Sequence, residues 1–184
     1  MVDLPSHFQS HIPIESNGPA AEHLTAVTGL SGQRIKQAMQ KGAIWLTRDN
    51  RTYRLRRAKK PLQPGDTLHI YYNEQILATV PSPPRLIADE GAYSVWYKPY
   101  GMRSQGSRWG DHCTIHRWVE KHLRPQRPAF VVHRLDRAAT GLMLVAHQKR
   151  TAAGLAGLFQ NRTIEKRYRA VVHNCFPSTP QPLT

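Results

Sequence analysis

The stretch Val131–Ala146 reads VVHRLDRAATGLMLVA and places one carboxylate, Asp136, between two arginines, Arg134 and Arg137. Short apolar runs rich in branched residues lie on both sides of these charges, a pattern typical of strands that enter and leave a packed interior. Residues 81–184 contain six acids against sixteen lysines and arginines, so Asp136 is not one of many carboxylates. The pattern predicts a reactive carboxylate on a loop at a strand end, presented to an anionic substrate.

The whole chain of 184 residues carries a formal net charge of +14 at pH 7. Such an excess of positive charge indicates a polyanionic partner, most often nucleic acid, with an anionic membrane surface as the lesser alternative. No apolar run approaches the roughly 20 residues of a membrane-spanning helix, and neither end resembles a secretory signal or a lipidation motif. Two cysteines are too few for a disulfide framework and fit a reducing compartment. We therefore expect a cytoplasmic nucleic-acid binder with no membrane partner.

The distribution of charge along the chain predicts its division into domains. Residues 1–29 have a net charge of −3, residues 30–80 of +7 and residues 81–184 of +10. Consecutive prolines favour stiff, extended geometry, and Pro81-Ser82-Pro83-Pro84 is the best linker candidate. We predict, in chain order, an N-terminal extension (1–19), a small basic domain (20–80), a proline-rich linker (81–85) and a larger second domain (86–184).

The first domain has the pattern of two helices followed by strands. A helix over 20–28 is closed by Gly29, and Ser31 is the expected N-cap of a second helix. The segments Thr28-Gly29-Leu30-Ser31, Ile35-Lys36, Lys41-Gly42-Ala43-Ile44 and Leu62-x-x-Gly65-Asp66 resemble the small S4-type RNA-binding domain, named after a ribosomal protein, over about residues 20–73. The sequence departs from that pattern at Thr47–Asn50, where a short glycine-bearing turn is more common. The resemblance implies that the basic helix and the following hairpin dock on folded RNA.

Basic residues of this domain, with an interleaved tyrosine, are candidates for RNA contact. They are denser than solubility requires, and an aromatic ring among them suits stacking on an exposed base. The alternative is a solvated basic face beside a small core. Together with two cations of the second domain, the candidate RNA-binding residues are Arg34, Lys36, Lys41, Arg51, Tyr53, Arg54, Arg56, Arg57, Lys59, Lys60, Arg137 and Lys166.

The second domain alternates predicted strands and helices. Strands are expected at 93–97, on both sides of Asp136 and at 163–172, and helices at 114–122 and about 149–160. The expected class is therefore α+β: a small helix-hairpin RNA-binding domain, then a mixed or antiparallel sheet with flanking helices.

Four segments of this domain resemble the RluA-type family of pseudouridine synthases. They are Trp96-Tyr97-Lys98-Pro99-x-Gly101, His133-Arg134-Leu135-Asp136-Arg137, Gly141-Leu142 with the apolar strand after it, and Lys166-x-Tyr168-x-Ala170. The resemblance implies an isomerase that breaks the glycosidic bond of a uridine in ribosomal or transfer RNA, rotates the base and rejoins it through a ring carbon. It also implies that no cofactor is needed.

The resemblance implies roles for individual residues. Asp136 is the catalytic carboxylate, either as a nucleophile on the sugar or as a base, since a carboxylate among cations is anionic and does not donate a proton. Arg134 and Tyr168 are the other catalytic residues that the resemblance implies: Arg134 fills the gap left by the flipped uridine or holds a phosphate, and Tyr168 stacks on the uracil and helps with the proton on the ring carbon. Lys166 and Arg137 are phosphate or structural contacts. The alternative is that Asp136 has no catalytic role and only forms an ion pair with Arg134 or Arg137.

Other chemistry is less well supported by the sequence. His133 is expected to be structural rather than a catalytic base. The cluster His112, Cys113, His116 and His122 lacks a paired ligand motif, so no metal is expected.

The family's catalytic domain normally continues beyond the point that corresponds to Thr184, so we expect only its N-terminal portion here. The competing hypothesis is therefore a non-catalytic RNA-binding protein whose second domain is inert.

Overall fold

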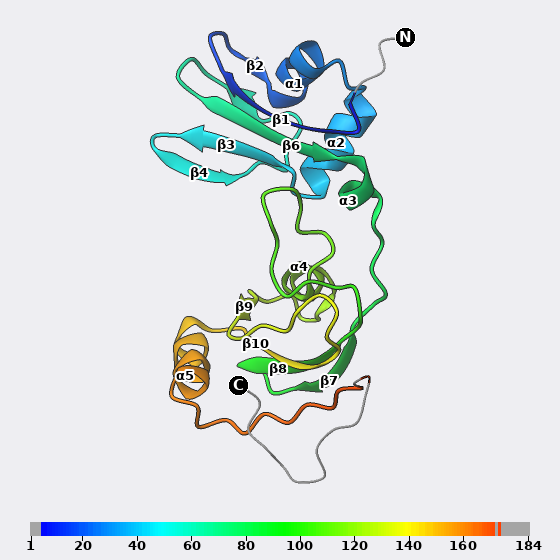
Figure 1. Ribbon diagram of the computed structural model, residues 1–184. Helices are drawn as coiled ribbons and strands as arrows, with labels where there is room; N and C mark the ends of the chain where they lie inside the picture. Colours follow the sequence, from blue (N-terminus) through cyan, green and yellow to red (C-terminus); the bar gives the residue numbers. More distant parts are fainter. Residues whose placement is uncertain (1–4, 172, 174–184) are drawn as a thin grey trace.

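The computed structural model describes residues 5–171 and 173, which form two lobes joined by an extended connection (Figure 1). In the first lobe the elements are β1 (His7–Pro13), β2 (Gly18–Pro19), α1 (Ala20–Thr28), α2 (Gly32–Gln40), β3 (Ile44–Arg48), β4 (Arg51–Arg54), β5 (Pro61–Leu62), β6 (Thr67–Asn73) and α3 (Glu74–Ala78). In the second they are β7 (Arg85–Asp89), β8 (Tyr93–Lys98), α4 (Ile115–His122), β9 (Phe130–Val131), β10 (Gly141–Ala146) and α5 (Lys149–Gln160). Both lobes mix helices with an antiparallel sheet, so the predicted α+β class is confirmed.

The first lobe packs its helices on one face of a four-stranded sheet with strand order β1-β6-β3-β4. The predicted end of α1 is confirmed, because Gly29 adopts the left-handed conformation (φ 70°) after it. The predicted start of α2 is also confirmed, because the Ser31 side chain accepts the Arg34 N–H. The core of this lobe is apolar; Leu24, Ile35 and Leu68 are among its fully buried side chains.

The segment 1–19 is not the simple extension that we predicted. Residues His7–Pro13 pair with β6 along its whole length and form an edge of the sheet. Only Ile12 of this strand is buried, so its apolar signal is too weak to reveal a strand that depends on a distant partner.

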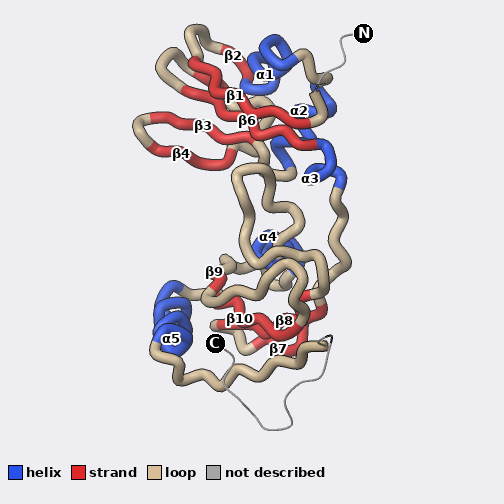
Figure 2. Tube along the Cα trace, viewed as in Figure 1, coloured by secondary structure: helices blue, strands red, loops and turns tan. Residues whose placement is uncertain are grey.

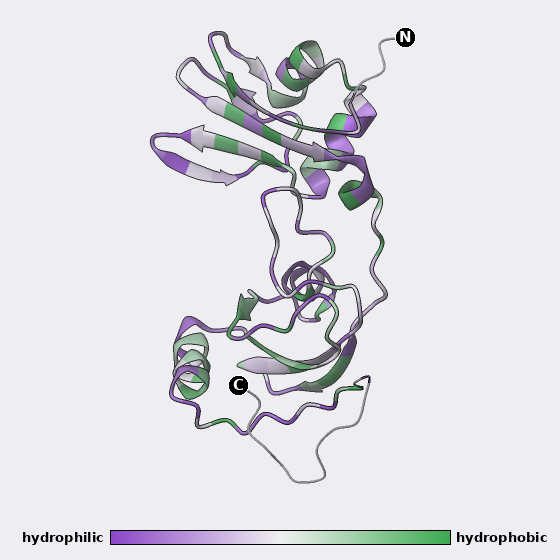
Figure 3. Cartoon of the chain, in the orientation of Figure 1, coloured by the Kyte–Doolittle hydropathy of each residue, from purple (hydrophilic) through white to green (hydrophobic). Residues whose placement is uncertain are grey.

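The β3–β4 hairpin turns at Asp49 and Asn50, which both have positive φ (51° and 58°). This is the geometry of a two-residue turn that matches the twist of the strands, and Asp and Asn tolerate it better than most residues without glycine. The departure of Thr47–Asn50 from the S4-type pattern therefore still produces a tight hairpin. Its tip is strongly hydrophilic (Figure 3).

In the second lobe the strand order is β7-β8-β10-β9, and Trp96, Met102, Ile115, Val119 and Met143 form much of the core. The helices predicted at 114–122 and 149–160 are present, and Thr114 caps α4 by accepting the Arg117 N–H. The prediction of a strand over 163–172 is wrong for the residues that the structure describes. Residues 163–171 join no sheet and run as an irregular, mostly exposed segment after α5 (Figure 2), while residue 172 lies outside the described residues.

The two lobes are held together by the loop between β8 and α4, which rises from the second lobe to the first (Figure 1). Asp111, 6% exposed, forms ion pairs with Arg54 and Arg56, and its N–H donates to the Lys41 carbonyl (3.0 Å). Arg54 also donates to the carbonyl of Ser107 (2.8 Å). We call these contacts the interlobe joint.

Candidate active site

Asp136 lies on the loop between β9 and β10, as predicted from the apolar runs around it, and it is exposed. Within the described part of the chain, no ion pair or side-chain hydrogen bond engages its carboxylate. Arg134 and Arg137 are both exposed and do not pair with it. The structure therefore gives no support to the alternative in which Asp136 only accepts an ion pair from its neighbours, and its oxygens are available to a substrate.

The backbone on each side of Asp136 is fixed by hydrogen bonds from another loop. The buried Ser104 hydroxyl donates to the Leu135 carbonyl (2.7 Å) and accepts the Leu135 N–H (3.0 Å). The Gly101 N–H donates to the Arg137 carbonyl (2.9 Å). An exposed side chain thus projects from a clamped backbone, which is the arrangement that presents a reactive group in one orientation.

Lys98 is a charged residue at this site that sequence reasoning did not single out. Its side chain is fully buried, and Nζ donates to the carbonyls of Met102 (2.7 Å) and Pro99 (3.1 Å). Burial lowers the pKa of Lys98, whereas the Asp136 carboxylate acts in the opposite direction. The signal in the sequence is the alternation of β8, in which Ser94, Trp96 and Lys98 occupy the inward positions.

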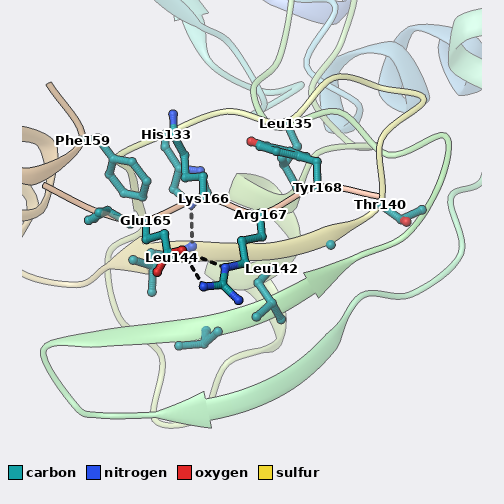
Figure 4. Close-up of a pocket in the computed structure, with 13 residues that line it drawn as sticks. His133, Leu135, Thr140, Leu142, Leu144, Phe159, Glu165, Lys166, Arg167 and Tyr168 are labelled. Carbon is teal, nitrogen blue, oxygen red and sulfur yellow. Dashed lines mark hydrogen bonds and ion pairs between the residues drawn. The ribbon is translucent and has the colours of Figure 1, made fainter. Parts of the chain in front are cut away.

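Beside the Asp136 loop is a cavity of about 470 Å³, shown in Figure 4. Leu135 and Thr140, on either side of Asp136 in the loop, line this cavity, but Asp136 itself does not. Lys166 and Tyr168 line it from the irregular segment after α5. A second cavity, of about 490 Å³, shares Lys166 and Tyr168 and is also lined by Arg134.

The structure therefore brings three of the predicted site residues, Arg134, Lys166 and Tyr168, to common cavities next to the loop of Asp136. Tyr168 is 68% exposed because its segment is not part of the sheet. Arg137 points elsewhere: it lines a small pocket with Arg103 and Cys113. The cation side chains at this site thus lie on two sides of the Asp136 loop.

His133 has structural contacts, as the sequence analysis favoured. Its ring stacks on Phe159 (centroids 4.2 Å apart), and Nε2 accepts the Leu144 N–H (2.9 Å). Burial, and secondarily Lys166, lower the pKa of His133, so the neutral ring that this acceptor role requires is favoured. Among the described residues, no group of three or more His, Cys, Asp or Glu side chains is arranged to hold a metal ion.

The predicted RNA-binding residues of the first lobe fall into three groups. Lys41, Arg54 and Arg56 are only partly exposed and have intramolecular partners at or near the interlobe joint. Arg34 forms an exposed ion pair with Glu74 (3.1 Å) on the surface of α2. The remaining candidates lie at the surface without side-chain partners among the described residues: Lys36, Arg51, Tyr53, Arg57, Lys59 and Lys60.

In the part of the chain that the structure describes, no helix combines the length and apolar character that a bilayer span requires.

Comparison with known proteins gives a consistent result. Residues 92–183 match the family model described as RNA pseudouridylate synthase. The ribosomal large subunit pseudouridine synthase D of Neisseria meningitidis serogroup B is 27% identical over 181 residues, which are 90% of this chain and 46% of that protein. The dual-specificity RNA pseudouridine synthase RluA of Vibrio vulnificus is 41% identical over 76 residues, or 41% of this chain and 29% of that protein.

Among solved structures, the human RNA pseudouridylate synthase domain containing 4 is 26% identical, with a TM-score of 0.36, and the alignment covers 42% of this chain and 30% of that one. The chain spans less than half of the length of each of these relatives. The family match extends over half of the chain and includes Asp136, Arg134 and Tyr168.

Proposed function

Because the chain belongs to the RNA pseudouridylate synthase family, we propose that it isomerises a uridine of structured ribosomal or transfer RNA to pseudouridine, with Asp136 as the catalytic carboxylate. The reaction exchanges the bond from the ribose to the ring nitrogen for a bond to a ring carbon. No electrons are gained or lost, so the proposal includes no cofactor. A cytoplasmic location belongs to the same proposal.

The observation that carries this proposal is the free carboxylate on a clamped loop. Asp136 is exposed and unpaired within the described residues, while Ser104 and Gly101 hold the residues beside it. A carboxylate in this state serves either as a base that accepts a proton or as a nucleophile on a sugar carbon, and the proposal includes both roles. Beneath the loop, Nζ of the buried Lys98 donates to the carbonyls of Met102 and Pro99, and the Asp136 carboxylate opposes the lowering of the Lys98 pKa by burial.

The target uridine has to leave its stack to reach this carboxylate, at a cost of a few kcal/mol. The cavities that Arg134, Lys166 and Tyr168 line offer space for an extruded nucleotide beside the Asp136 loop. In the proposal, Tyr168 stacks on the uracil, Arg134 takes the vacated position in the helix or a phosphate, and Lys166 contacts the backbone. Arg137 contacts phosphate on the other side of the loop.

The first lobe is proposed to hold the RNA as an S4-type domain. Among the described residues, Lys36 on α2 and the cations of residues 57–60, after the β3–β4 hairpin, have no ion-pair partner and are free for phosphate contacts, whereas Arg34 pairs with Glu74. Arg54 and Arg56 contribute instead to the orientation of the two lobes, through their partners at the joint. The Lys41 side chain donates to the Leu77 carbonyl within the first lobe, and its own carbonyl accepts the Asp111 N–H.

The test is release of tritium from RNA labelled at carbon 5 of uracil. The ring carbon that forms the new bond to ribose loses its hydrogen, so each pseudouridine formed releases one tritium. Unmodified transcripts of ribosomal and transfer RNAs are incubated with the chain, and release above the rate without protein is expected for one RNA class.

A second candidate function is RNA binding without catalysis. The observation in its favour is the segment of Tyr168, which lies outside the sheet and leaves that side chain 68% exposed. Saturable RNA binding with no tritium release from any transcript favours this candidate and contradicts the proposed isomerase.

The two hydrogen bonds between Ser104 and Leu135 predict that a residue outside the substrate cavities affects the catalytic rate. In Ser104→Ala, both hydrogen bonds to Leu135 are lost and the Asp136 loop gains freedom, so kcat should fall by about 10- to 100-fold while KM changes little. Single-turnover tritium release at saturating RNA measures this. Ser82→Ala, at an exposed position in the connection, is the control, and an unchanged kcat in Ser104→Ala would show that the clamp does not position Asp136.

The exposed cations near the hairpin predict a salt effect. A triple variant Arg51→Ala, Arg57→Ala, Lys59→Ala should bind RNA more weakly, and the slope of log affinity against log salt should shrink by about 3, because each phosphate contact contributes nearly one. Filter binding across a salt series measures the slope. The matched triple variant Lys149→Ala, Arg150→Ala, Arg162→Ala removes the same charge from the exposed surface around α5, and equal slopes for both variants would contradict a specific surface.

A further inference from the structure

One face of the first sheet points away from the hydrophobic core and carries aromatic rings. On β6, His69 and Tyr71 alternate with the buried Leu68, Ile70 and Tyr72. Strand pairing places His11 of β1 and Trp45 of β3 opposite His69 on this same outer face.

The rings on the outer face form a continuous series. Tyr71 meets the edge of His11 (centroids 5.9 Å apart), and His11 meets His69 (4.9 Å), where the two Nδ1 atoms share a hydrogen bond of 2.6 Å. The His69 Nε2 in turn bonds to the Thr47 hydroxyl (2.7 Å). These contacts hold the rings in place, so a ligand that stacks on them would not have to order them first.

The second lobe extends this series. Trp109, from the loop of the interlobe joint, stacks on His7 (4.6 Å) and meets the edge of Tyr71 (5.7 Å). The guanidinium of the neighbouring Arg108 lies 5.4 Å from the Tyr71 ring centroid, and the Arg108 carbonyl accepts the Trp45 indole N–H (3.0 Å). The aromatic face is therefore completed by residues of the lobe that contains Asp136.

The charge of this sheet suits a polyanion. The strands β1, β3, β4 and β6 contain no aspartate or glutamate, and the exposed Arg108 lies over the Tyr71 ring beside them. Of the strand arginines, Arg48 pairs with Asp66 and Arg54 with Asp111, so Arg108 is the cation offered to a phosphate at the rings. A single-stranded nucleic acid binds where cations contact its phosphates, aromatic rings stack on its bases and no carboxylate repels its backbone.

We propose that the outer face, centred on His11, Tyr71 and Trp109, is a stacking platform for single-stranded RNA. The ligand class is an unpaired stretch of the substrate, because base faces are inaccessible inside an A-form duplex. The proposal rests on the proposed function for its RNA, and it places a second RNA contact apart from the exposed cations near the hairpin. Nucleotides that flank the target uridine would stack here while that uridine reaches Asp136.

The experiment is a fluorescence-anisotropy titration of the full chain with a labelled oligouridylate of about 12 nucleotides. Tyr71→Ala and His11→Ala are each expected to weaken its affinity by about tenfold, since one base loses its stacking partner. His11 is exposed, so that variant tests the platform even if Tyr71→Ala unfolds. Tyr97→Ala, an exposed tyrosine on the second sheet, is the matched control and should bind as the unaltered chain does. A duplex of the same length should be insensitive to both platform variants.

Intrinsic fluorescence gives an independent readout. Oligouridylate should quench the tryptophan emission of the unaltered chain, and Trp109→Phe should remove most of that quenching. Unchanged oligouridylate affinity in His11→Ala, or an equal loss in Tyr97→Ala, would overturn the platform. Tritium release measured in parallel separates the two proposals: release with unchanged binding contradicts the platform alone, and platform-dependent binding without release contradicts the isomerase alone.

Discussion

Asp136→Asn is expected to reduce tritium release by at least about a thousandfold, because the amide neither attacks the ribose nor removes a proton. The substitution keeps the size of the side chain, and the carboxylate it replaces has no partner among the described residues. Folding should therefore be unaffected, and RNA affinity should stay close to that of the unaltered chain. Single-turnover release and filter binding on the same RNA measure the two quantities.

The matched control for Asp136→Asn is Glu165→Gln. Glu165 is a carboxylate that lines the cavity beside the Asp136 loop, but it is paired with Arg167 (2.7 Å) and lies on the irregular segment. Its neutralisation should leave tritium release unchanged. If Asp136→Asn kept the rate of the unaltered chain, Asp136 would not be the catalytic carboxylate, whatever its motif implies.

Local signals in the sequence predicted much of the fold. Ser31 and Thr114 begin helices and Gly29 ends one, because capping involves residues within one turn of each other. The strands on both sides of Asp136 were predicted from short apolar runs. The placement of Asp136 on an exposed loop follows from the same signals, and its unpaired state could be seen only in the structure.

The features that the sequence did not reveal depend on partners far along the chain. The edge strand β1 pairs with β6, about sixty residues away, and carries little apolar alternation of its own. Conversely, the sequence of 163–172 favours a strand, but residues 163–171 have no sheet partner. Strand propensity is expressed only where a neighbouring edge provides hydrogen bonds.

The partners of the charged residues at the candidate site also lie far along the chain and could not be predicted from the sequence. A run of cations after β3 predicts RNA contact for all of its members, yet Arg54 and Arg56 face Asp111 of the other lobe. Ser104 lies outside the quoted motif segments, and Lys98 lies within one of them with no role assigned to it, because the roles of both residues are set by the carbonyls and amides that tertiary folding brings to them.

Asp111→Ala is expected to uncouple the two lobes and to lower the free energy of unfolding by about 3 kcal/mol. Asp111 is the buried carboxylate on which Arg54 and Arg56 converge, and burial already lowers the pKa of Arg54. Removal of the carboxylate leaves two partly buried cations facing each other without a counter-charge. Calorimetry should then resolve two transitions, one for each lobe, in place of one.

The control for this prediction is Asp89→Ala, which removes a different ion pair, with Arg127, inside the second lobe. That pair is more exposed, so its loss should cost about 1 kcal/mol or less and leave a single transition. Arg56→Ala combined with Asp111→Ala should recover part of the lost stability, because one of the two uncompensated cations is then also absent. A single transition at an unchanged temperature in Asp111→Ala would mean that the lobes are coupled by the aromatic contacts of Trp109 rather than by this charge.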